Sequence, residues 1–102
     1  MALPTIKPML EATWLLSGQL SADAPVRTIR VEGSPFTVGR HSQAALTIPS
    51  PTVSNAHAEL CIVDGVLHVR DLGSTNGTFI NGERIEGEFS VSSGDLLQFA
   101  EV

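Results

Sequence analysis

Short polar side chains and glycines concentrate in one stretch of this chain, residues 71–82, which reads DLGSTNGTFING. A loop of this composition can direct its backbone N–H groups and hydroxyls outward. It then forms a polar surface suited to binding an anion, rather than part of a hydrophobic core. Thr75 and Asn76 lie at the expected tip, where Thr75 can donate to a phosphate oxygen and Asn76 can bridge a peptide C=O and N–H. Taken alone, Asn76-Gly77 is also an ordinary turn signal.

Residues upstream of this loop offer a positive charge and further donors. Arg40 follows Gly39 at the end of an expected strand, and its planar guanidinium matches two phosphate oxygens; by position alone, it could equally be a solvated arginine. Ser54 can donate its hydroxyl and backbone N–H, and Asn55 can offer its amide to a phosphate or to a bound backbone. Together with the 71–82 loop, these residues predict a site for a phosphorylated peptide.

Ser54, His57 and Asp71 are also the residue types of a hydrolytic triad. No Gly-x-Ser-x-Gly sequence surrounds Ser54, however, and a serine and a histidine so close in sequence seldom have independent directions. We therefore expect His57 to be a buried imidazole that hydrogen-bonds loop backbone, and we predict that the chain is not an enzyme.

No metal or cofactor is predicted either. The three histidines, His41, His57 and His68, are scattered without a second ligand at a recurring spacing. The glycine-rich loop lacks the lysine and the following helix of a nucleotide-binding P-loop.

Bulk properties limit the remaining classes. A length of 102 residues with 42% hydrophobic composition indicates one folded domain. Six basic against eleven acidic residues give a formal charge of -5, which argues against nucleic-acid binding. The apolar runs are too short for a membrane span, and the two prolines near the start interrupt any signal peptide. With a single cysteine and hence no internal disulfide, we expect a cytoplasmic protein.

Short β-type runs separated by turn signals fill the chain after a leader at residues 1–11 and make residues 12–102 the folded domain. Asp64-Gly65 and Asn81-Gly82 are favoured two-residue hairpin turns. No window shows a sustained helical period, so we predict an all-β sandwich of two twisted, mostly antiparallel sheets with little or no helix. The expected strands are 12–17, 26–31, 36–38, 45–48, 57–63, 66–71, 78–80, 83–85, 89–91 and 96–99. Residues 100–102 resemble the start of a further strand, so we expect a truncated last strand and a fragment of a longer, multidomain protein.

Four motifs in order resemble the forkhead-associated (FHA) domain family across about residues 26–102. They are Gly39-Arg40, Ser54-x-x-His57, the 71–82 segment and the sequence SGDLLQF at 93–99. The resemblance implies a β-sandwich of about 11 strands whose loops at one end bind phosphothreonine peptides.

The resemblance also implies a role for each matching residue. Arg40, Ser54 and Thr75 contact the phosphate, and Asn76 holds the peptide backbone beside it. Asn55 stands where many family members carry arginine or lysine, so one positive charge is missing. The loop-shaping positions are Gly39, His57, Gly73 and Gly77.

The expected partner is thus a protein containing phosphothreonine, placed downstream of a Ser/Thr kinase, and the domain serves as a signalling adaptor. The alternative is a scaffold domain whose partner docks without phosphate. Binding that survives phosphatase treatment of a partner distinguishes the second from the first.

Overall fold

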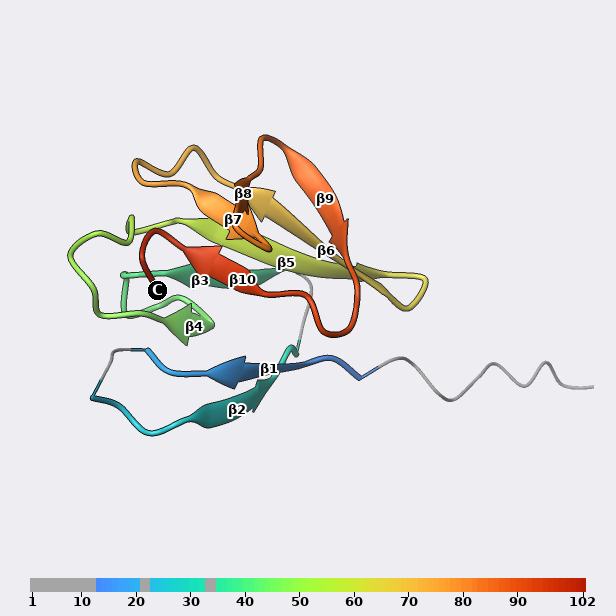
Figure 1. The fold of residues 1–102 in the computed structure, drawn as a ribbon, viewed down its shortest axis with the longest axis horizontal. Coiled ribbons are helices and arrows are strands. Elements are labelled where there is room, and N and C mark those ends of the chain that lie inside the picture. The colour runs from blue at the N-terminus through green and yellow to red at the C-terminus, as the bar shows by residue number, and fades with distance from the viewer. Residues whose placement is uncertain (1–12, 21–22, 33–34) are drawn as a thin grey trace, which may run out of the picture.

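The computed structural model describes residues 13–20, 23–32 and 35–102. The leader predicted at residues 1–11 lies outside this part. The described residues form strands and turns without a helix, as Figure 1 shows. The strands are β1 (Leu15–Gly18), β2 (Arg27–Arg30), β3 (Phe36–Gly39), β4 (Leu46–Thr47), β5 (Ala58–Val63), β6 (Val66–Asp71), β7 (Thr78–Ile80), β8 (Glu83–Arg84), β9 (Glu88–Val91) and β10 (Leu97–Phe99).

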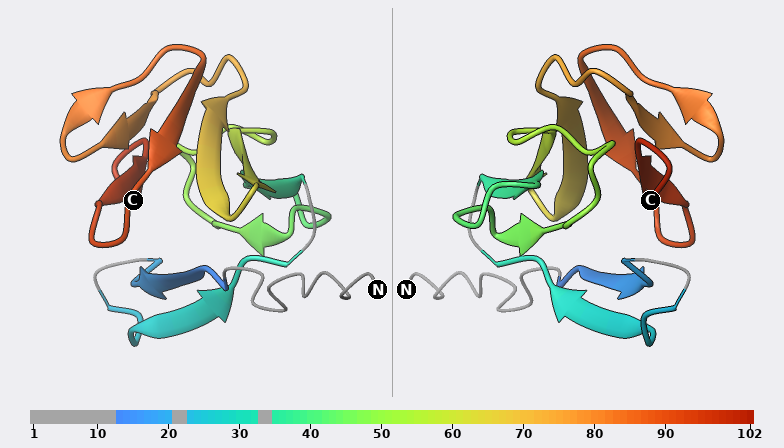
Figure 2. Two further views of the ribbon diagram at one scale, coloured as in Figure 1. Left: turned by 90° about the vertical axis from the view of Figure 1, so that its right-hand side faces the viewer. Right: turned by 90° about the vertical axis from the view of Figure 1, so that its left-hand side faces the viewer.

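The strands form a five-stranded sheet in the order β4-β3-β5-β6-β9 and a three-stranded sheet in the order β10-β7-β8. Every pairing is antiparallel except that of β3 with β4. Figure 2 shows these two sheets facing each other, with the β1–β2 hairpin beneath them. The predicted all-β, mostly antiparallel sandwich is therefore confirmed.

The division into sheets differs from the prediction of two sheets and about 11 strands. Within the described residues, ten strands form three hydrogen-bonded sheets, because β1 pairs with β2 alone and β10 with β7 alone. A mainly apolar groove of about 550 Å³ lies along this division, lined in part by Trp14, Leu16, Ile29 and Phe99. Residues 100–102, expected to begin a strand, form a turn in which Val102 N–H donates to Phe99 O at 3.0 Å.

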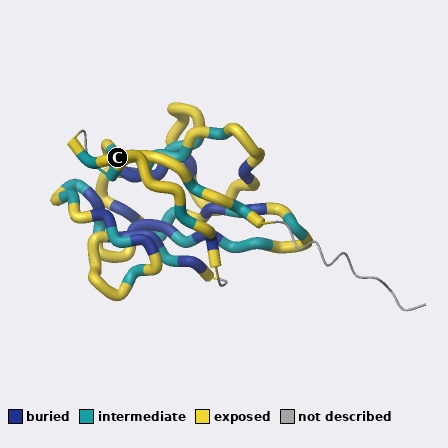
Figure 3. The backbone as a smooth tube through the Cα atoms, turned by 90° about the horizontal axis from the view of Figure 1, so that it is seen from below, coloured by how far each residue is buried: buried dark blue, intermediate teal, exposed yellow. Residues whose placement is uncertain are grey.

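Side-chain alternation places the core between the sheets. Leu60 of β5 and its cross-strand partner Val69 of β6 are fully buried, while the next pair, Cys61 and His68, is only half-buried on the opposite face. Figure 3 shows the buried segments running through the middle of the molecule. Turn chemistry sets the hairpins, since Asp64-Gly65 and Asn81-Gly82 all have positive φ, between 51° and 85°.

Candidate functional site

Three loops meet at one end of the sandwich: the end of β3 and its connection to β4, the β4–β5 loop, and the β6–β7 loop (Figure 1). Backbone hydrogen bonds join the first two loops. Arg40 N–H donates to Ser54 O at 3.0 Å, and His41 N–H donates to Asn55 O at 3.3 Å. Ile48 N–H donates back to Gly39 O at 2.8 Å, which fixes the beginning of the β4–β5 loop.

Gly39 allows this close approach because it has no side chain. A Cβ at this position would overlap Asn55 O and lie 2.9 Å from Asn55 C and 3.1 Å from Ser54 O. These are backbone atoms, so the loop itself would have to move. The glycine thus lets the chain that leads into Arg40 pack directly against the loop that carries Ser54.

His57 connects the β4–β5 loop to the β6–β7 loop from inside the protein. Its side chain is fully buried, and its Nδ1 accepts a hydrogen bond from Ser54 N–H at 3.0 Å. Its Nε2 donates to Gly77 O at 2.7 Å, since a carbonyl can only accept. The ring also meets Phe99 edge to face, with centroids 5.9 Å apart. This is a neutral imidazole that holds loop backbone on both of its nitrogens.

The residue types of a triad are present, but they do not form one. The Ser54 hydroxyl oxygen accepts a hydrogen bond from Thr75 N–H at 3.1 Å, and both ring nitrogens of His57 are bonded to backbone. Asp71 is occupied by other partners. No proton path therefore runs from Ser54 through His57 to Asp71.

Asp71 and Ser74 organise the β6–β7 loop, a role that the sequence reasoning missed. Asp71 Oδ2 accepts from the N–H groups of Gly73 and Ser74, each at 3.0 Å, and Oδ1 accepts from the hydroxyls of Ser74 at 2.5 Å and Thr78 at 2.7 Å. Ser74 Oγ in turn accepts from Gly77 N–H at 3.0 Å. The available signal was the aspartate two residues before a glycine, which is typical of an Asx turn.

These hydrogen bonds also control the ionisation of Asp71. Burial by itself raises the pKa of this carboxyl, but the bonds from Ser74, Thr78 and Gly73 together outweigh it and hold the pKa below the ordinary value of 3.8. The carboxylate is therefore charged at neutral pH, and its acceptor capacity is directed into the loop.

At the tip of the β6–β7 loop, Thr75 and Asn76 are exposed. The Asn76 amide donates to Thr52 O at 2.7 Å, which ties the tip to the β4–β5 loop and leaves its second N–H and its oxygen for other partners. Gly73 and Gly77 have φ values of +75° and +88°, a backbone region that glycine adopts without strain. The positive φ values of these two glycines therefore set the course of the backbone through the β6–β7 loop.

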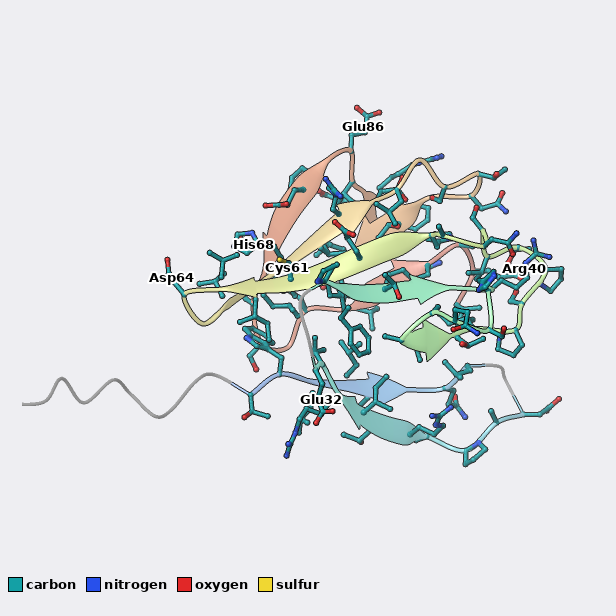
Figure 4. All side chains as sticks on the ribbon, turned by 180° about the vertical axis from the view of Figure 1, so that it is seen from behind. Glu32, Arg40, Cys61, Asp64, His68 and Glu86 are labelled. Atoms are coloured by element: carbon teal, nitrogen blue, oxygen red, sulfur yellow. The ribbon has the colours of Figure 1, made fainter. Side chains whose placement is uncertain are left out.

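The predicted phosphopeptide-binding residues thus lie in one cluster, which we call the loop cluster: Arg40, Ser54, Asn55, Thr75 and Asn76. Arg40 and Asn55 are exposed, and Arg40 forms no ion pair within residues 13–20, 23–32 and 35–102. Figure 4 shows Arg40 at the end of the molecule where the loops meet. The cluster offers a guanidinium, two hydroxyls and two amides, a donor set suited to an anion beside a peptide backbone.

The part of the chain described by the structure contains no group of three or more acidic, histidine or cysteine side chains that could hold a metal ion. Nor does that part contain a helix long and apolar enough to cross a membrane.

A sequence model of the FHA domain matches residues 36–100. The oxoglutarate dehydrogenase inhibitor of Corynebacterium diphtheriae is 44% identical over 62 residues, which cover 61% of this chain and 43% of that protein. The glycogen accumulation regulator GarA of Mycolicibacterium smegmatis is 36% identical over 62 residues, 61% of this chain and 39% of that protein. The chain therefore matches less than half the length of these curated relatives.

Solved structures of FHA domains also resemble this chain. One, from a structural and functional analysis of phosphothreonine-dependent FHA domain interactions, has a TM-score of 0.73 and 28% identity, and the match covers 85% of both chains. Mycobacterium tuberculosis EmbR, in complex with a low-affinity phosphopeptide, shares the fold with a TM-score of 0.76 at 23% identity, covering 88% of this chain and 23% of that one. With its family match, its sandwich and its joined loops, this chain belongs to the FHA domain family.

Proposed function

We propose that this FHA domain binds phosphothreonine-containing segments of other proteins through the loop cluster and acts as an adaptor in signalling. The observation that carries the proposal is the position of Arg40, an exposed arginine without an ion-pair partner in the described residues. Its backbone is bonded to that of Ser54, and the Ser54 hydroxyl is bonded to Thr75 N–H. The structural relative studied for phosphothreonine-dependent interactions supports the same ligand.

Each residue has a distinct role in this proposal. Arg40 pairs with the phosphate, and the hydroxyls of Ser54 and Thr75 donate to its remaining oxygens. Asn76 uses its second N–H and its oxygen to hold the peptide backbone beside the phosphothreonine, and Asn55 adds a neutral donor. The domain binds without catalysis, in the cytoplasm, and a Ser/Thr kinase produces its ligand.

The proposal is tested with an oriented peptide library that fixes phosphothreonine and varies its flanks, with phosphoserine and unphosphorylated versions alongside. The best phosphothreonine peptide is then titrated against wild type, Arg40→Ala and Arg30→Ala. Arg30 is a suitable control because it is an exposed arginine of β2 paired with Glu32, outside the loop cluster.

Loss of Arg40 removes a charge-assisted pair, so we expect affinity to fall by about 2 kcal/mol, roughly thirtyfold, with little change for Arg30→Ala. Equal affinity of Arg40→Ala and wild type contradicts the assignment. Absence of binding to every phosphopeptide, together with a native partner that still binds after phosphatase treatment, would favour the phosphate-independent scaffold.

A further inference from the structure

A second arginine lies beside the loop cluster. Arg84 belongs to β8, and its backbone pairs with Phe79 of β7. This register brings its side chain across Gly77, where a Cβ would lie 2.8 Å from Arg84 Nε, 3.1 Å from Cζ and 3.2 Å from Cδ. Gly77 directly follows Asn76, so the guanidinium borders the tip of the β6–β7 loop.

The charge of Arg84 is available to a ligand. The residue is exposed and, like Arg40, it has no ion-pair partner within the described residues, whereas Arg30 and Arg70 pair with Glu32 and Glu59. The nearby Glu86 does not neutralise it through an ion pair, and Figure 4 shows Glu86 directed away from the body of the molecule at its upper edge.

The hairpin that carries Arg84 is held in place from its other end. The Asn81 amide donates to Asp95 Oδ1 at 3.0 Å, and Asn81 Oδ1 accepts from Leu96 N–H at 2.9 Å. Ile85 N–H, next to Arg84, donates to Thr78 O at 2.9 Å. The backbone below the guanidinium is therefore fixed, and only the side chain has to order when a ligand binds.

Contacts run in sequence across this end of the molecule. Arg40 adjoins Ser54 through backbone, Ser54 adjoins Thr75, and Gly77 adjoins Arg84. The two residue steps from Thr75 to Gly77 span at most about 7.6 Å, since consecutive Cα atoms are about 3.8 Å apart. An extended peptide advances about 3.3 Å per residue, so this span corresponds to about two residues of a bound peptide. The Arg84 side chain that borders Gly77 adds about one residue more, which places its guanidinium within about three residues of a phosphate at Thr75.

We propose that Arg84 selects an anionic side chain within about three residues of the phosphothreonine, and so contributes to the sequence preference of the domain. This inference rests on the proposed function, because it needs a phosphopeptide that crosses Asn76. The favoured side chain is a carboxylate or a second phosphate, both of which match the fork of a guanidinium.

The experiment uses the same oriented library with wild type, Arg84→Gln, Arg84→Glu and the control Arg30→Gln. Wild type and Arg30→Gln are expected to enrich Asp, Glu or a phosphorylated residue at one position near the phosphothreonine. Arg84→Gln loses this enrichment, and Arg84→Glu prefers Lys or Arg there. For the selected acidic peptide, affinity for Arg84→Gln falls about tenfold, while a peptide with alanine at that position binds wild type and Arg84→Gln within twofold.

The alanine peptide also reports whether the loop has survived the substitution. An equal loss of affinity for both peptides, or an acidic preference that Arg84→Gln retains, overturns the role of Arg84. Phosphothreonine binding that depends on Arg40 but shows no acidic preference overturns only this inference. Failure of wild type to bind any phosphothreonine peptide instead refutes the proposed function, and with it the ligand assigned to Arg84.

Discussion

Replacing His57 tests whether this one buried ring joins the two loops of the site. His57→Phe keeps a ring of similar size against Phe99 but removes both hydrogen bonds. Ser54 N–H then loses its acceptor, while Gly77 O keeps the bond that it accepts from Ala100 N–H at 2.9 Å. An unsatisfied polar group costs about 1–3 kcal/mol and the loss of an ordinary hydrogen bond about 0.5–1.5 kcal/mol, so His57→Phe predicts destabilisation of roughly 1.5–4.5 kcal/mol. This is a large fraction of the stability of a small domain, which is typically about 5–15 kcal/mol.

Two further variants separate the two bonds. Asn at position 57 can place an acceptor near the position of Nδ1 and keep the bond from Ser54 N–H, while Gln can place a donor near the position of Nε2 and keep the bond to Gly77 O. Each variant is therefore expected to lose less stability than His57→Phe.

Urea unfolding followed by fluorescence measures these differences, because Trp14 is half-buried and its indole N–H donates to Gly65 O at 3.0 Å. A His57→Phe protein within about 0.5 kcal/mol of wild type, the range of neutral surface substitutions, would refute the bridging role.

Three other predictions follow from the same geometry. Gly39→Ala should destabilise the domain by about 1–3 kcal/mol and weaken phosphopeptide binding, because its Cβ meets Asn55 backbone; unchanged melting and titration curves would exclude that clash. Asp71→Asn should reduce the loss of stability at acid pH. Because the pKa of Asp71 is lowered in the folded state, the ionised carboxylate stabilises wild type fully above pH 3.8, and this stabilisation is lost as pH falls through the folded-state pKa. Identical dependence of stability on acid pH in wild type and Asp71→Asn would contradict this reasoning. Phosphopeptide affinity should fall below about pH 6 as the phosphate takes up its second proton, and titrations that show no change between pH 7.5 and 5 would argue against an electrostatic site.

Local chemistry made much of the fold predictable. Asp64-Gly65 and Asn81-Gly82 adopt the positive φ values that their hairpin turns require, and the strands on either side begin within one residue of the expected limits. The assignment of β1 and β10 to two different sheets was not predictable from local chemistry. It depends on which strand edges meet across the sandwich, and no single segment of the sequence encodes that.

The candidate site shows the same limit. Its residues could be chosen by type and spacing, and the structure brings Arg40, Ser54 and Thr75 into one cluster. The anchoring role of Asp71 depends on four donors converging on one carboxylate, and a motif does not show that convergence. The position of Arg84 depends on the register between β7 and β8, so its contact with Gly77 appears only in three dimensions.

Stability and recognition are carried by different residues at this end of the sandwich. Buried or half-buried groups such as His57, Asp71 and Ser74 satisfy the loop backbone and fix its shape before any ligand arrives. Since ordering a loop on binding lowers affinity, loops already held in this way leave more of the interaction energy for the ligand. Arg40 and Arg84 stand on that fixed backbone as exposed charges with no ion pair in the described residues, so neither charge is committed to another group of the protein. A chain of net charge -5 can still accommodate an anion here because the guanidinium groups are exposed, whereas the Asp71 carboxylate of the same loop is directed into hydrogen bonds with loop donors.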